Sequence, residues 1–170
     1  YLTRAIKTLE LIMKVNKFKN LPFTKAWELN ERHYGALTGL NKDEMKKKLS
    51  ENKVHELRRS WDKPPDVLDT SSIYHPNKID IYKNVPKDKI PNTESLRDTY
   101  ERVVPYYKKN INSINKNILI SAHGNSIRAL CKYLFNLSNE NISKLEIPTG
   151  NPLLLEIDND KAKSAKYLDP

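Results

Sequence analysis

The sequence predicts an α/β fold, in which a buried strand leads through a polar corner into a helix. The strand prediction rests on residues 118–120, an unbroken apolar run typical of a strand covered on both faces. Ser126 is expected to cap the following helix, whose apolar residues continue to Leu137. A second apolar segment, 153–157, follows the turn at 147–152 and predicts another strand. Together with amphipathic helices elsewhere, these strands define the α/β class.

Length and charge bound the class of protein. A chain of 170 residues suits one domain, 1–170, with a sizeable core. The net charge of +9, from 30 Lys and Arg against 21 Asp and Glu, favours anionic ligands, nucleic acid among them. Many positive residues, however, lie in Lys-rich runs such as 46–48, which are typical of a solvated face. We therefore give the charge little weight and expect neither a nucleic-acid nor a membrane partner.

The single cysteine and the hydropathy pattern bear on location. Cys131 cannot form an internal disulfide, which favours a reducing compartment, and we expect a cytoplasmic protein. No run of eighteen apolar residues predicts a membrane-spanning helix, and the segment from Tyr1 onward does not resemble a signal peptide. Four scattered histidines and one cysteine have no zinc-type spacing, so no metal site is expected.

The first element is an amphipathic helix over 3–14. Arg4 lies in its first turn, where a cation opposes the helix dipole, and this makes Arg4 a candidate for holding an anion. The alternative is a solvated surface arginine. Residues 21–29 alternate loosely and predict a short strand.

The loop 29–42 concentrates titratable side chains between glycines, which is typical of a functional loop held by a rigid scaffold. Glu31 could act as a general acid or base if cations and burial set its pKa. The alternative is that Glu31 and Arg32 form a surface ion pair of little value.

Asn41 and Glu44 have capping-box spacing and predict a helix that runs to Arg58 and Arg59. Two guanidinium groups at a helix end suit phosphate or carboxylate, and Pro64 predicts that the helix ends before it. Residues 64–91 carry scattered prolines and predict a long irregular segment.

The second half of the chain returns to regular elements. We expect a helix over 93–111, kinked or divided at Pro105, and a short helix from Ser138 to Leu145. A short edge strand is expected at 165–168.

The corner at 123–126 is the strongest candidate site. His123, Gly124 and Asn125 stand where a strand ends and a helix begins, so an imidazole, an amide and free backbone N–H groups converge on a possible anion. The alternative is a loop histidine whose ring is satisfied by a backbone carbonyl.

Five segments carry a resemblance to a known family. They are LNERHYGALTGLNK at 29–42, RRSWDKPP at 58–65, TESL at 93–96, AHGNSIR at 122–128 and IPTGNP at 147–152. In order and spacing they resemble the cofactor-dependent phosphoglycerate mutases of the histidine phosphatase superfamily. The resemblance covers nearly the whole chain. It implies an α/β fold with a mostly parallel sheet flanked by helices, and interconversion of 3-phosphoglycerate and 2-phosphoglycerate through a phosphohistidine, primed by 2,3-bisphosphoglycerate without a metal.

The resemblance also implies roles for particular residues. Glu31 would donate and accept the proton of the substrate hydroxyl, while His123 and Arg4 would contact the transferring phosphoryl group. The residues implied to bind the rest of a small phosphorylated substrate are Arg32, Tyr34, Lys42, Arg58, Arg59, Gly124 and Asn125. We also expect a homo-oligomer.

One motif of this family is missing. The nucleophilic histidine of the family lies in an N-terminal Arg-His-Gly motif, and these 170 residues contain no such motif. We therefore expect an N-terminally truncated sequence that lacks a central strand and cannot itself form the phosphoenzyme. Two alternatives stay open, a phosphatase of the same superfamily acting on a small metabolite and a non-catalytic phosphate or polyanion binder.

Overall fold

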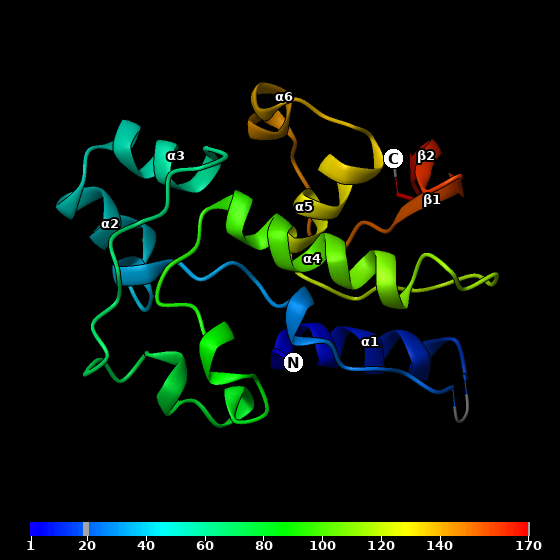
Figure 1. Ribbon diagram of the computed structural model, residues 1–170, viewed down its shortest axis with the longest axis horizontal. Helices are drawn as coiled ribbons and strands as arrows, with labels where there is room; N and C mark the ends of the chain where they lie inside the picture. The colour runs from blue at the N-terminus through cyan, green and yellow to red at the C-terminus, as the bar shows by residue number, and fades with distance from the viewer. Residues whose placement is uncertain (19–20, 170) are drawn as a thin grey trace.

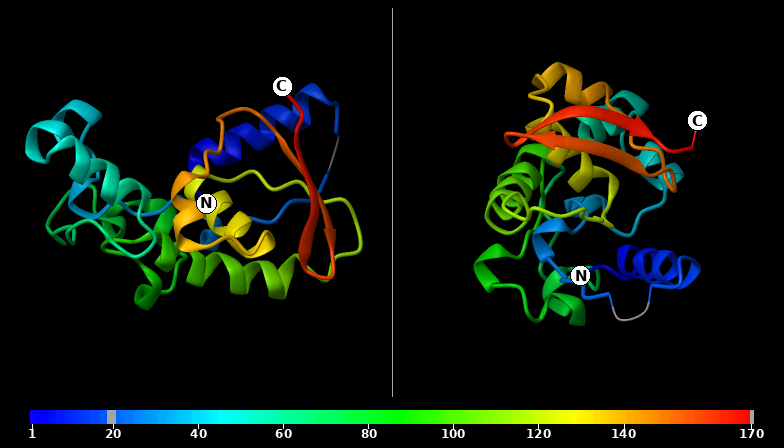
Figure 2. Two further views of the ribbon diagram at one scale, coloured as in Figure 1. Left: turned by 90° about the horizontal axis from the view of Figure 1, so that it is seen from above. Right: turned by 90° about the vertical axis from the view of Figure 1, so that its right-hand side faces the viewer.

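A computed structural model describes residues 1–18 and 21–169, with the side chains of residues 42, 46 and 48 also outside the described part. Two packed helices, α4 and α5, occupy the middle of the molecule, with α2 and α3 at one end and the two strands toward the other (Figures 1 and 2). The helices are α1 (Thr3–Val15), α2 (Lys42–Lys48), α3 (Glu51–Arg59), α4 (Leu96–Asn110), α5 (Gly124–Leu134) and α6 (Asn139–Lys144). The strands are β1 (Leu153–Asp158) and β2 (Lys161–Tyr167).

The main core lies between α4 and α5. Leu96, Val103 and Tyr107 of α4 pack with Ala129 and Leu134 of α5, and all five are buried. Burial of large apolar side chains contributes roughly 1.5–3 kcal/mol each to folding, so this pair is the main source of stability among the helices. The site elements described below are attached to these two helices.

The start of α4 is a capping box at Ser95. The Ser95 hydroxyl accepts from the backbone N–H of Asp98 at 3.2 Å, and the Asp98 carboxylate accepts from the backbone N–H of Ser95 at 2.7 Å. The helix therefore begins three residues after the predicted start at residue 93. It is not divided at Pro105, which is exposed and lies inside the continuous helix.

The prediction that Ser126 caps α5 is wrong, because His123 is the N-cap residue and Ser126 lies in the first turn. The Ser126 hydroxyl accepts from the backbone N–H of His123 at 3.3 Å, so the helix begins earlier than expected. The helix ends at Leu134 rather than Leu137, because Asn136 adopts a left-handed backbone conformation with φ of 50°.

The single helix predicted from Asn41 to Arg59 forms two helices. Asn41 does cap α2 through a capping box with Glu44, as predicted. Helix α2 ends at Lys48, with Leu49 as its C-cap residue. The Ser50 hydroxyl then caps α3 by accepting from the backbone N–H of Lys53 at 3.3 Å. The two helices share a small second core that contains Leu37, Met45, Val54 and Leu57.

Strands β1 and β2 form an antiparallel hairpin, in which Leu153 pairs with Tyr167 and a bulge follows Glu156. Asn159 and Asp160, both with positive φ, make the turn. The second strand is longer than the predicted 165–168. The predicted irregular segment 64–91 contains only three short 3-10 turns, η3 (Pro76–Lys78), η4 (Asp80–Tyr82) and η5 (Lys87–Lys89).

Two extended segments, 21–26 and 117–122, run through the molecule without forming strands (Figure 2). In the described part of the chain, none of their backbone N–H groups donates a hydrogen bond to another backbone group. The prediction of a strand buried on both faces at 118–120 is wrong in this respect, because Ile118 and Leu119 are 43% and 53% exposed. The short strand predicted over 21–29 likewise ends in a 3-10 turn, η1 (Trp27–Leu29).

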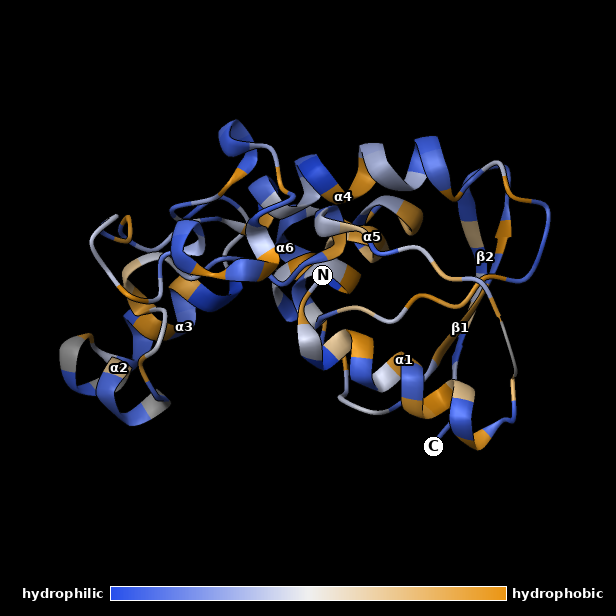
Figure 3. Ribbon diagram, turned by 90° about the horizontal axis from the view of Figure 1, so that it is seen from below, coloured by the Kyte–Doolittle hydropathy of each residue, from blue (hydrophilic) through white to orange (hydrophobic). Residues whose placement is uncertain are grey.

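Helix α1 confirms the amphipathic helix predicted over 3–14, and hydrophobic and hydrophilic residues interchange along it (Figure 3). Its side chains Ala5, Ile6 and Leu9 face a small cavity rather than a packed core, and no residue of the helix is fully buried. Across the described residues, no helix combines the length and apolar character needed to cross a membrane.

Candidate functional site

Arg4 and His123 meet although 119 positions separate them in the sequence. The guanidinium Nη2 of Arg4 donates to Nδ1 of His123 at 3.0 Å. Because arginine only donates, Nδ1 accepts and the ring proton of the neutral imidazole lies on Nε2. Nε2 is buried and has no hydrogen-bond partner within the described residues. The ring thus offers an unused donor, and it is not satisfied by a backbone carbonyl.

The electrostatic surroundings keep His123 neutral. Burial lowers the pKa of His123, and the nearby Arg4 cation lowers it further, while the Glu31 carboxylate opposes them. A neutral imidazole beside a guanidinium group suits an anionic group, which both can contact without mutual repulsion.

Glu31 is held by one of its two carboxylate oxygens. Oε1 accepts from the backbone N–H of Arg32 at 2.8 Å and from the Asn125 amide Nδ2 at 2.9 Å. The same Nδ2 also approaches the Tyr34 hydroxyl at 2.9 Å, so the helix start of α5 reaches the 29–42 loop. Oε2 makes no hydrogen bond among the described residues and is available for a proton.

The alternative of a surface ion pair between Glu31 and Arg32 is not what the structure shows. Arg32 is 2% exposed, and its guanidinium Nη2 donates to the carbonyl of Leu57 at 2.9 Å. Its Nε and Nη1 are buried without a hydrogen-bond partner in the described part of the chain. Buried donors left open in this way are costly unless a ligand fills them.

Two guanidinium groups lie close to the Tyr34 ring. Its ring centroid is 4.6 Å from the Arg32 guanidinium carbon and 5.7 Å from that of Arg58. Two guanidinium groups against one aromatic ring are stabilised by cation–π attraction, and together they provide positive charge for an anion.

One cavity of about 450 Å³ is lined by half of the predicted residues. Arg4, Glu31, Arg32, Tyr34 and Arg58 all line it. The structure therefore brings together side chains from α1, the 29–42 loop and the end of α3.

Other predicted residues lie outside that lining. Asn125 and Gly124 start α5, and Asn125 reaches the cavity only through Glu31 and Tyr34. Arg59 turns away and pairs with the exposed Glu146. The side chain of Lys42 lies outside the described residues.

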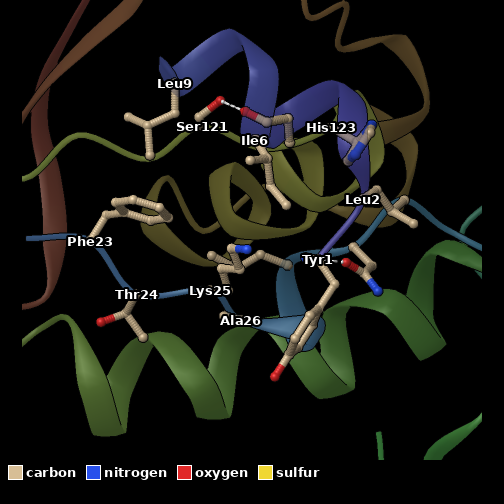
Figure 4. Close-up of a pocket in the computed structure, with 13 residues that line it drawn as sticks. Tyr1, Leu2, Ile6, Leu9, Phe23, Thr24, Lys25, Ala26, Ser121 and His123 are labelled. Atoms are coloured by element: carbon tan, nitrogen blue, oxygen red, sulfur yellow. Dashed lines mark hydrogen bonds between the residues drawn. The ribbon is translucent and has the colours of Figure 1, made fainter. Parts of the chain in front are cut away.

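His123 lines a second, smaller cavity of about 60 Å³ next to α1 (Figure 4). The labelled side chains Ile6, Leu9 and Phe23 make this cavity largely apolar, and His123 lies at one end of it. The Ser121 hydroxyl donates to the carbonyl of Ala5 at 2.8 Å and attaches the extended segment to α1 (Figure 4). The Arg4–His123 contact thus joins the apolar cavity to the cationic one.

Sequence reasoning missed a buried ion pair that holds the loop of Glu31. Arg102 Nε donates to Glu94 Oε1 at 2.7 Å, and the two side chains are 12% and 6% exposed. Arg102 also donates to the carbonyl of Glu31 at 3.2 Å, and Glu94 Oε2 accepts from the backbone N–H of His33 at 2.8 Å. The only sequence signal was that Glu94 belongs to the TESL segment, because Arg102 lies off the apolar face of α4.

Arg128 was also missed, although it belongs to the AHGNSIR segment. It is 4% exposed among apolar neighbours on α5, and its Nη1 donates to the Asn125 Oδ1 at 3.1 Å. Arg128 shares its side of α5 with Asn125 and Lys132, so the apolar pattern of the helix gave no signal that Arg128 is buried.

The fold and this site define the class of protein. The family model of the histidine phosphatase superfamily (branch 1) matches residues 1–75 and 68–170. The chain belongs to this superfamily, whose fold is α/β, and the predicted class is confirmed. The hydrogen-bonded strands of the described part, β1 and β2, are antiparallel and do not belong to the parallel portion expected of the sheet.

Individual relatives are more specific. The chain is 59% identical over 170 residues to a 2,3-bisphosphoglycerate-dependent phosphoglycerate mutase of Pelagibacter ubique, covering 98% of this chain and 71% of the relative. Relatives with the same name from Hyphomonas neptunium and Maricaulis maris are 49% and 44% identical. The alignments cover 98% and 99% of this chain and 71% and 72% of those relatives.

Proposed function

We propose that this chain belongs to an enzyme that interconverts 3-phosphoglycerate and 2-phosphoglycerate through a phosphohistidine, in glycolysis. The observation that carries the proposal is the convergence of Arg4, Glu31, Arg32 and Arg58 on one cavity, with His123 bonded to Arg4. The names of the relatives from three bacteria support the same reaction.

The residues divide between the two ends of the substrate. Arg4 and the Nε2 donor of His123 hold the oxygens of the transferring phosphoryl group, where charge spreads in the transition state. Glu31 exchanges a proton with the substrate hydroxyl through Oε2, because Oε1 is already occupied by two N–H donors.

The cation cluster holds the carboxylate and the second phosphate. Arg32 has two buried donors without a partner among the described residues, and Arg58 is close to the same aromatic ring, so the pair fits a doubly anionic ligand. The same features fit 2,3-bisphosphoglycerate, which supplies the priming phosphoryl group when bound. We include Tyr34, Lys42, Arg59, Gly124 and Asn125 in the proposed binding site, and no metal.

The nucleophile is not among the histidines of this chain. None of the four histidines, His33, His55, His75 and His123, stands in an Arg-His-Gly motif. His33 and His75 each accept a backbone N–H on Nδ1, from Gly35 at 3.1 Å and from Asn77 at 3.2 Å. A test protein for the reaction therefore needs a segment that carries this motif in front of Tyr1.

The decisive assay follows both possible products in that test protein. With 3-phosphoglycerate and primer, we expect 2-phosphoglycerate to form faster than inorganic phosphate is released. Phosphate release without isomerisation would instead show a phosphatase of the same superfamily.

We further propose a cytoplasmic homo-oligomer that acts on small phosphorylated molecules and binds neither nucleic acid nor membranes. The buried, unpaired Cys131 supports a reducing location. Affinity for nucleic acid that falls steeply with salt would contradict the proposed partners.

A further inference from the structure

Arg128 is a buried cation that the proposed chemistry does not use. It is 4% exposed, and no carboxylate forms an ion pair with it in the described part of the chain. Burial and the nearby cations Arg59 and Arg32 lower the pKa of Arg128 to about 10, so the guanidinium group stays charged at neutral pH. Keeping an unpaired charge at this position is unfavourable, and the geometry indicates what the charge does.

The guanidinium group is fixed at two points. Nη2 donates to the carbonyl of Ile142 in α6, and Nη1 donates to Oδ1 of Asn125 one helical turn earlier in α5. The group is therefore held between two helices in one orientation, and only Nε has no partner among the described residues.

This arrangement determines which way the Asn125 amide faces. Arginine can only donate, so the amide oxygen of Asn125 must point to Arg128 and the NH₂ group must point away. On that side Nδ2 donates to Oε1 of Glu31 at 2.9 Å. A flipped amide would place Oδ1 against the carboxylate, where two acceptors repel each other.

Resting on the proposed role of Glu31, we propose that Arg128 is a positioning residue that orients Asn125 so that its amide holds Oε1 of Glu31 and leaves Oε2 free for the proton. Arg128 acts through Asn125 and need not touch the substrate. A general acid or base must lie within hydrogen-bond reach of its proton, so the orientation of this carboxylate decides whether it can act.

Nuclear magnetic resonance on the 170-residue chain tests the proposal without any turnover. The quantity measured is the change in chemical shift of the Asn125 side-chain NH₂ protons when Glu31 is replaced by Gln. This change reports the hydrogen bond between the two residues. We expect this change to be at least about twofold smaller in an Arg128→Met background than in the wild-type background, because the amide loses its orienting donor.

Arg59→Met is the matched control. It also removes a cation close to Arg128, but Arg59 makes no hydrogen bond to Asn125. The Glu31→Gln response should therefore stay at its wild-type size in the Arg59→Met background. Equal losses in both backgrounds would show a general charge effect and would overturn the proposal.

Two further results would also overturn it. One is an unchanged response in Arg128→Met together with weaker binding of inorganic phosphate, which would make Arg128 an anion ligand. The other comes from a measurement on the wild-type chain, which replaces the variant if Arg128→Met does not fold. In the wild-type chain, the Nη resonances of Arg128 should be separate, because both groups are held, and averaged resonances would contradict the proposal. None of these measurements depends on mutase activity, so a failed mutase assay remains a separate result.

Discussion

At the scale of single residues, the site depends on which hydrogen-bonding positions are left open. His123 uses Nδ1 to accept from Arg4, and Glu31 uses Oε1 to accept two N–H groups. Among the described residues, the positions left open are one donor, Nε2 of His123, and one acceptor, Oε2 of Glu31. Phosphoryl transfer and proton transfer require this pair of functions.

Glu31→Gln tests the proton-transfer role. The amide keeps the size of the side chain and can still accept on one oxygen, but it cannot exchange a proton at neutral pH. In the test protein with the Arg-His-Gly segment, we expect the mutase rate to fall by about 100-fold or more with unchanged thermal unfolding. Glu101→Gln, an exposed change on α4, serves as the control. Unchanged turnover in Glu31→Gln would remove Glu31 from proton transfer.

Two buried histidines predict how stability depends on pH. Burial is the main cause that lowers the pKa of both His33 and His123. In the unfolded chain the pKa of histidine is about 6.5, so below that pH the unfolded chain binds more protons than the folded chain. The contribution of the two neutral histidines to the free energy of unfolding is fully present above about pH 6.5. It is lost as the pH falls through the pKa values of the folded chain.

Urea unfolding at several values between pH 7.5 and 5.5 measures this dependence. We expect the free energy of unfolding to decrease over the range in the wild-type chain, and to decrease less in a His33→Gln, His123→Gln double variant. Parallel profiles for the two proteins would show that these histidines do not carry the effect.

At this scale, local position and motifs predict some of the residues that share a cavity. Arg4 and Glu31 were predicted from position and composition and Arg32 from the family resemblance, and all three line one cavity. Arg128 and Arg102 were not predicted, because Arg128 also bonds the Ile142 carbonyl 14 positions away and Arg102 bonds the Glu28 carbonyl 74 positions away, and only the folded chain brings these close.

At the scale of elements, α4 does more than form the core. Arg102 of α4 and Glu94, just before the helix, hold the chain on both sides of Arg32, at the Glu31 carbonyl and the His33 N–H, and the ion pair is largely removed from water. Local signals such as the capping boxes at Asn41 and Ser95 mark where helices start. The break at Leu49 follows instead from a second cap at Ser50 that the longer helical pattern concealed.

Glu94→Gln should destabilise the chain strongly, because it leaves the Arg102 charge buried without its partner. We expect a loss of about 3–5 kcal/mol in the free energy of unfolding, measured with urea. The matched control is Glu101→Gln on α4, whose partner Arg97 is 60% exposed, and it should cost less than about 1 kcal/mol. Equal small losses in both variants would show that the buried pair does not hold the loop.

At the scale of the whole molecule, the structure differs from the expected sheet in two extended segments, 21–26 and 117–122, which do not form strands. The apolar sequence at 118–120 fits a strand, yet its backbone has no ladder partner within the described residues and its side chains are partly exposed. Strand formation needs a neighbour, and the hydrophobic pattern of a segment does not reveal whether one is present.

Hydrogen exchange measures this difference directly. In the 170-residue chain, we expect the amides of 117–122 to exchange at least about 100-fold faster than those of α5, whose N–H groups bond within the core helix. Mass spectrometry of the two peptides compares them in one sample. Equal protection would mean that 117–122 is paired in solution.

The most direct test of the central claim is the primer dependence of isomerisation. In the test protein that carries Arg-His-Gly in front of Tyr1, phosphorus nuclear magnetic resonance would follow the conversion of 3-phosphoglycerate with and without 2,3-bisphosphoglycerate. We predict that 2-phosphoglycerate accumulates to equilibrium only when the primer is present, and that Glu31→Gln slows this by about 100-fold. No 2-phosphoglycerate from the folded protein with primer present would contradict the proposed function.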